Sequence, residues 1–153
     1  MLHAWESIYA NSAVLRTLIG FVHIAGLVVG GGCAIVADRA TLRAYRRSAA
    51  NRAAEIDGIR AAHRVVLAGL AAVMVSGVLL MSADFDTFVH SRIFWVKMGL
   101  VAMLLLNGAL LSRLGSTAAV NDAQWKRLAY VSGFSLALWL LTTLTGAALP
   151  NVG

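Results

Sequence analysis

Apolar residues gather in four long runs that alternate with short polar segments. The runs cover about residues 13–37, 61–83, 93–114 and 128–149. At about 1.5 Å per residue, each helix of this length crosses a hydrocarbon core of about 30 Å. No proline interrupts a run, and Pro150 follows the last one, where we expect the helix to end. The pattern predicts an all-α fold: an integral membrane four-helix bundle that forms a single membrane domain over residues 1–153.

The polar segments predict how the bundle is oriented. The segment 38–64 is rich in alanine and holds many more arginines than acidic residues, and the segment 115–127 is basic toward its end. Short loops rich in Lys and Arg stay in the cytoplasm, so both termini are expected on the non-cytoplasmic side. The connection 84–92 is short, which predicts that the second and third spans are antiparallel neighbours.

Composition narrows the class of protein. Of the 153 residues, 59% are hydrophobic and only 13% are charged, whereas soluble domains are about a quarter charged. The net charge of +6 lies mostly in the loops, so we interpret it as a topology signal and expect no nucleic-acid partner. Cys33 is the only cysteine, which excludes a disulfide within the chain. The first residues lack a basic n-region, so the first span is expected to remain as an anchor.

The first span carries a histidine deep inside an apolar helix. His23 shares one helical stripe with Gly20, Gly26 and Gly30. An imidazole in hydrocarbon is costly unless something binds it, and glycines leave room for a close neighbour. The stripe therefore either packs against another helix or holds a cofactor, with His23, Gly26 and Gly30 as candidate binding residues.

Three more residues are candidates for ligand binding. His63 begins the second span near Asp38, and His90 lies in the connection 84–92. Lys97 lies just inside the third span, where it either snorkels to the interface or binds a carboxylate such as a haem propionate. His23, His63 and His90 are the candidate metal ligands, but their depths differ, and we do not expect His23 and His63 to bind one haem together.

Methionines offer a different chemistry. Thioethers together with histidine select Cu(I), and the second and third spans hold Met74, Met81, Met98 and Met103. Methionine also fills gaps in apolar helices, which needs no metal. Copper is therefore an alternative to haem.

Two segments resemble known families of small bacterial membrane proteins. The second span reads GLAAVMVSGVLL from Gly69, and the third opens FWVKMGLVAMLLLNG from Phe94. With a histidine in the first span, they resemble the membrane protoporphyrinogen oxidase family and the copper-resistance D family. The resemblance implies a haem b or copper protein of the bacterial inner membrane, in which His23 and Lys97 are the counterparts of a family histidine and lysine. The segment from Leu128 onward lacks the carboxylates usual near the last span of those families.

Three functions follow from these patterns. The first is a haem b protein in electron transfer or porphyrin oxidation, with His23 as axial ligand, which would be an oxidoreductase if it is an enzyme. The second is a copper-handling protein that uses His23 with Met74 or Met81. The third is a cofactor-free assembly subunit that binds a membrane-complex partner, or a second copy of itself as a homodimer, through the glycine stripe. No catalytic residue is assigned.

Overall fold

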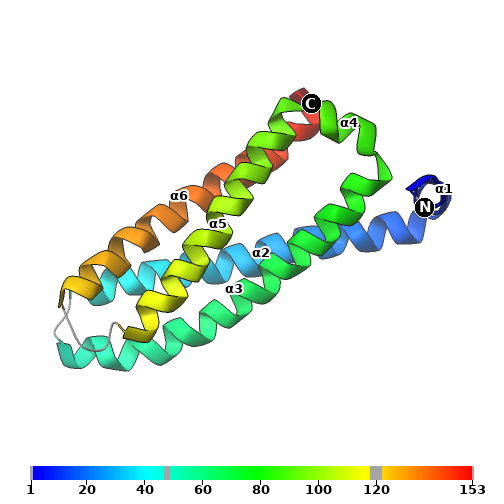
Figure 1. Cartoon of the computed structure of the whole chain (residues 1–153). Coiled ribbons are helices and arrows are strands. Elements are labelled where there is room, and N and C mark those ends of the chain that lie inside the picture. Colours follow the sequence, from blue (N-terminus) through cyan, green and yellow to red (C-terminus); the bar gives the residue numbers. More distant parts are fainter. Residues whose placement is uncertain (1, 47–48, 118–121, 153) are drawn as a thin grey trace.

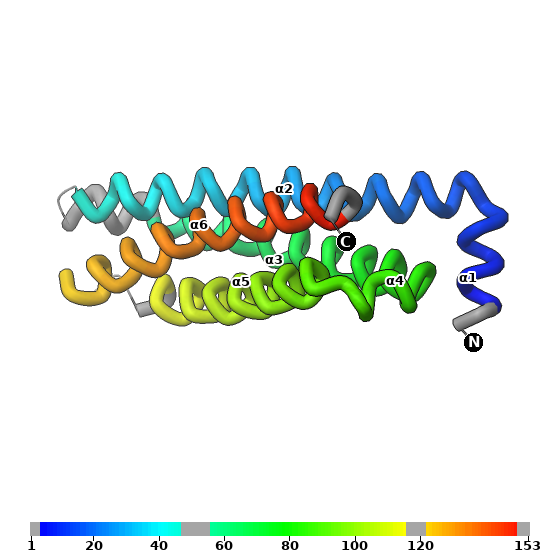
Figure 2. The backbone as a smooth tube through the Cα atoms, turned by 90° about the horizontal axis from the view of Figure 1, so that it is seen from above, coloured from blue at the N-terminus to red at the C-terminus, as the bar shows by residue number. Residues whose placement is uncertain are grey.

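The computed structural model describes residues 2–46, 49–117 and 122–152, and these residues form six helices. Four are long and two are short (Figure 1). The long helices are α2 (Ala13–Tyr45), α3 (Ala49–Ala83), α5 (Arg92–Thr117) and α6 (Asp122–Val152). The short ones are α1 (Leu2–Asn11), which lies across the end of α2 (Figure 2), and α4 (Phe85–His90).

The four long helices are each long and apolar enough to cross a membrane. The distribution of side chains agrees with this, because large apolar residues face outward while small polar ones are buried. Val14 is 70% exposed and Leu106 72%, whereas Ser132 is 0% and Asp38 1% exposed. Such an apolar surface suits lipid and not water. The chain therefore has the character of an integral membrane protein, as the sequence predicted.

The helices extend beyond the predicted spans. Helix α2 continues to Tyr45 and α3 begins at Ala49, so the described parts of the arginine-rich segment are helical, because alanine and arginine are strong helix formers. Helix α6 begins at Asp122 and passes Pro150 to end at Val152. We call the end of the molecule where α2 ends and α3 begins the hairpin end, and the opposite end, where α4 lies, the α4 end.

Helix α2 is central to the arrangement. It packs along α3 on one side and against α6 on another, and α5 packs along α6 (Figures 1 and 2). Helices α3 and α5, which contain the second and third predicted spans, contact each other at few positions. They are therefore neighbours only at those positions. Helix α4 lies between the end of α3 and the start of α5 (Figure 1), and α3 packs mainly along α2.

The crossing of α2 and α3 depends on three glycines. A Cβ on Gly69 would lie 2.6 Å from Cα of Gly30 and 2.9 Å from the carbonyl oxygen of Gly26. Real Cβ atoms do not approach so closely, so only glycine lets these two backbones meet. This is the close approach that small residues permit between membrane helices.

Apolar packing is concentrated away from the α4 end. One cluster at the hairpin end includes Ala44, Ile59 and Trp125, and a second, further along, includes Leu70 and Trp139. Around His23, toward the α4 end, the contacts between helices involve polar side chains. The candidate site therefore lies outside both apolar clusters.

Candidate functional site

His23 is held by a hydrogen bond that crosses from α2 to α3. Its Nδ1 lies 3.0 Å from Oγ of Ser76. The Ser76 hydroxyl has one proton, and its Oγ lies 2.6 Å from the carbonyl oxygen of Ala72, which can only accept. With the Ser76 hydroxyl donating to the Ala72 carbonyl, the tautomer of His23 that fits this geometry carries its proton on Nδ1 and donates it to Ser76. The backbone carbonyl of Val73 also accepts a hydrogen bond from the His23 ring, so Ser76 and the α3 backbone hold the ring together. A ring that carries its proton on Nδ1 would offer the Nε2 lone pair to a metal.

Lys97 reaches the same region from α5. A Cβ built on Gly146 of α6 would lie 3.5 Å from Nζ of Lys97, so the amine rests where α6 has no side chain. Lys97 is also close enough to His23 for its charge to act on the ring. Both side chains are half-buried. The structure therefore brings together the histidine and the lysine that the resemblance singled out.

Gly77 completes the surroundings of the ring. A Cβ on Gly77 would lie 3.5 Å from Cε1 of His23, so the ring edge packs against bare backbone of α3. We call His23, Ser76, Gly77, Lys97 and Gly146 the His23 site. All four long helices contribute to it, and its donors are one imidazole nitrogen with a free lone pair and one amine.

The other two candidate histidines lie elsewhere. Ser76 opposes His23, and His63 lies thirteen residues earlier on α3, which is about 20 Å along the helix. His90 is exposed on α4, where its Nδ1 donates to the carbonyl oxygen of Asp86 at 2.8 Å. Within residues 2–46, 49–117 and 122–152, no three His, Cys, Asp or Glu side chains gather as a metal site. His23, His63 and His90 are not brought together.

Gly26 and Gly30 are occupied by helix packing. Their close contacts with Gly69, and that of Gly26 with Val73, belong to the α2–α3 crossing. The stripe was predicted either to pack against another helix or to hold a cofactor. At Gly26 and Gly30 it packs against a helix of the same chain. The surface at Gly26 and Gly30 is covered by α3, so we leave both out of the His23 site.

Asp84 and three of the methionines are exposed. In the described part of the chain, Asp84 and Lys97 form no ion pair. Met74, Met98 and Met103 are between 40% and 45% exposed. They therefore belong in part to the apolar surface of the molecule.

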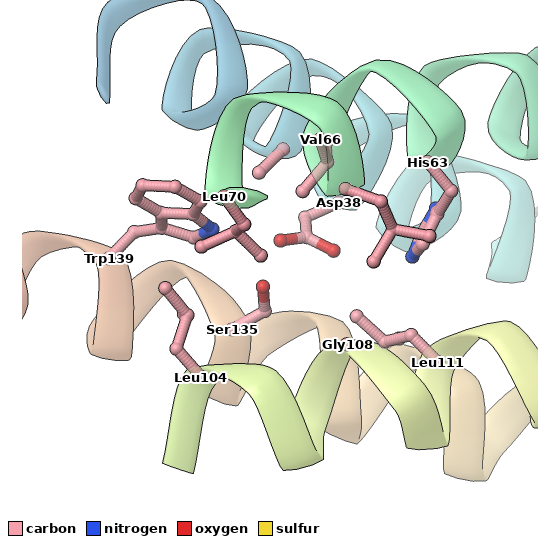
Figure 3. Close-up of a pocket in the computed structure, with 11 residues that line it drawn as sticks. Asp38, His63, Val66, Leu70, Leu104, Gly108, Leu111, Ser135 and Trp139 are labelled. Carbon is pink, nitrogen blue, oxygen red and sulfur yellow. The ribbon is translucent and has the colours of Figure 1, made fainter. Parts of the chain in front are cut away.

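A second group of polar side chains lies deeper toward the hairpin end, around Asp38. Asp38 lines a cavity of about 20 Å³ together with His63 of α3 and Ser135 of α6 (Figure 3). Ser135 hydrogen-bonds the Asp38 carboxyl group, yet the Asp38 Oδ2 atom has no partner among the described residues. The proximity of Asp38 and His63 that the sequence suggested is present.

Three residues of the His23 site, Ser76, Gly77 and Gly146, were not predicted from the sequence. Ser76 stood in an apolar run as one of several small residues, and only its place opposite His23 gives it a role. Gly146 has a role only because Lys97 approaches it, which depends on how α5 packs on α6. The single polar residue in VMVSGVLL was the one available signal for Ser76.

No family model matches the chain, and neither a curated protein nor a solved structure is significantly similar to it. The resemblance to the membrane protoporphyrinogen oxidase and copper-resistance D families therefore stays a prediction.

Proposed function

We propose that the protein is a haem b-binding protein of the bacterial inner membrane, with Nε2 of His23 as axial ligand and both termini on the non-cytoplasmic side. The observation that supports the proposal is the hydrogen bond between Nδ1 of His23 and Oγ of Ser76. Histidines that ligate metals usually donate their other ring N–H to a fixed acceptor, which orients the ring and raises its basicity.

Lys97 supports haem over a bare metal ion. An ammonium group near the imidazole repels a metal cation but attracts a carboxylate. Haem fits both side chains, because its iron can bind the imidazole of His23 and its propionates can bind the ammonium of Lys97. When bound, haem would provide one-electron chemistry, which suits electron transfer or porphyrin oxidation.

The proposal is tested by absorption spectroscopy of protein purified in detergent after expression with ample haem. We expect a Soret band in the wild type, its loss in His23→Ala, and its retention in His90→Ala, the control that removes an exposed histidine. Equal bands in wild type and His23→Ala would overturn the assignment of His23.

The alternative proposal, that the protein binds copper, is tested with the same purified proteins. Metal analysis after copper loading is expected to give little bound copper, because the ammonium of Lys97 lies near His23. One copper per chain, lost in His23→Ala, would replace haem with copper at this site.

A further inference from the structure

The cavity around Asp38 is separate from the His23 site. Asp38 lies fifteen residues after His23 on α2, which is about 22 Å along the helix. Its carboxyl is almost fully enclosed, at 1% exposure, between α2, α3, α5 and α6. A polar group so deep in an apolar bundle is costly unless it is satisfied, and such groups in membrane spans mark functional sites.

The cavity contains an unsatisfied hydrogen-bonding atom. Ser135 hydrogen-bonds the Asp38 carboxyl group, yet the Oδ2 atom of Asp38 has no partner among the described residues. A volume of about 20 Å³ holds about one water molecule. One water with several polar neighbours is what such a site is expected to hold.

His63 is the other titratable group at this cavity. Its Nδ1 donates to the carbonyl oxygen of Ile59 at 3.2 Å, so its Nε2 keeps a lone pair that can accept a proton. The ring reaches the edge of the cavity (Figure 3) and is close enough to interact electrostatically with Asp38. Unlike Asp38, His63 is only half-buried, so it connects the enclosed carboxyl to the outside of the bundle.

No other described charged side chain lines the cavity. Helix α3 contributes His63, α6 contributes Ser135 and Trp139, and α5 contributes Gly108 and apolar residues. On α2 itself, the neighbouring Arg39 is exposed. Asp38 and His63 therefore form an isolated acid–base pair.

We propose that this cavity binds one water molecule and that Asp38 and His63 exchange a proton through it. The O–H bond of the Asp38 carboxylic acid breaks as its proton passes to the water, and a proton of the water bonds to Nε2 of His63. Asp38 becomes a carboxylate and His63 an imidazolium, so charge is conserved and no other reactant is needed. The imidazolium then releases its proton on the exposed side, and the reverse sequence reloads Asp38.

The exchange is measured by infrared spectroscopy of the full chain in lipid nanodiscs after transfer from H2O to D2O. The carboxylic acid stretch of Asp38 is identified by its loss in Asp38→Asn. In His63→Phe we expect deuteration of this group to slow about 100-fold, the low end of what a positioned acid–base group contributes. His90→Phe is the matched control and should exchange at the wild-type rate.

Other outcomes decide against the proposal. Equal exchange rates in wild type and His63→Phe would overturn it. His63→Gln guards against misfolding of the phenylalanine variant and is also expected to slow exchange. Loss of the carboxylic acid band on adding Na⁺ but not choline would mean that the cavity binds a cation in place of a proton. None of these measurements requires haem, so failure of the haem proposal leaves them interpretable.

Discussion

At the scale of single residues, Ser76 has the most specific role. Its Oγ donates a hydrogen bond to the carbonyl oxygen of Ala72 on α3 and lies 3.0 Å from Nδ1 of His23. Such a bond fixes one tautomer and one ring orientation, so a ligand meets a prepared Nε2 atom. A serine in an apolar span is common as helix glue, which is why its role was not evident before the helices were placed.

Replacing Ser76 should weaken haem binding without abolishing it. In Ser76→Ala the His23 ring loses its acceptor, and we expect the dissociation constant of haem to rise about 10-fold, as for other partners of metal-ligating histidines. Equilibrium titration followed at the Soret band measures this. Ser82→Ala is the control on the same helix, because the Ser82 hydroxyl bonds only the α3 backbone. Equal affinities for Ser76→Ala and wild type would contradict the role of Ser76.

Lys97 is expected to act through the propionates of haem. Removal of the ammonium in Lys97→Gln should raise the dissociation constant about 10-fold, since a hydrogen bond to a charged group contributes about 1.5–3 kcal/mol. The loss should disappear when the titration is repeated with haem whose propionates are esterified. Lys126→Gln, at an exposed position of α6, is the control. A loss that persists with the ester would mean that Lys97 acts in another way.

At the scale of elements, the α2–α3 crossing holds the site together, because His23 and Ser76 lie on these two helices. Gly69→Ala places a methyl group 2.6 Å from Cα of Gly30 and should lower the free energy of unfolding by about 1–3 kcal/mol, as overpacking does. Unfolding in mixed detergent measures this. Gly99→Ala on α5 is the control, since its added Cβ meets nothing within 4 Å. An unchanged stability in Gly69→Ala would argue against the crossing.

The four long helices were largely predictable from the sequence. Which of these helices pack against each other was not. Four apolar runs without internal proline define four helices, because lipid leaves the backbone no other way to satisfy its hydrogen bonds. The order of packing depends instead on small residues at particular positions, such as Gly69. The sequence predicted that Asp38 lies near His63. It did not predict the contact of Asp38 with Ser135, because that contact depends on how α6 packs on α2.

At the scale of the whole molecule, the basic segments predict the sidedness. Cys33 is the only cysteine, so Cys33→Ala gives a background in which single cysteines report their location. Asp84→Cys should react with a membrane-impermeant maleimide applied to intact spheroplasts, because it precedes α4 on the side that is predicted to be non-cytoplasmic. Lys126→Cys should react only after permeabilisation. Both positions are exposed. Labelling of both from one side would contradict the predicted four-span topology.

The central claim is that the imidazole of His23 binds haem iron through Nε2. Its most direct test is His23→Gly titrated with haem, first alone and then with free imidazole. We predict that the Soret band of the wild-type complex is lost in the variant and returns when imidazole enters the space left by the ring. A full Soret band in His23→Gly without imidazole would contradict the claim.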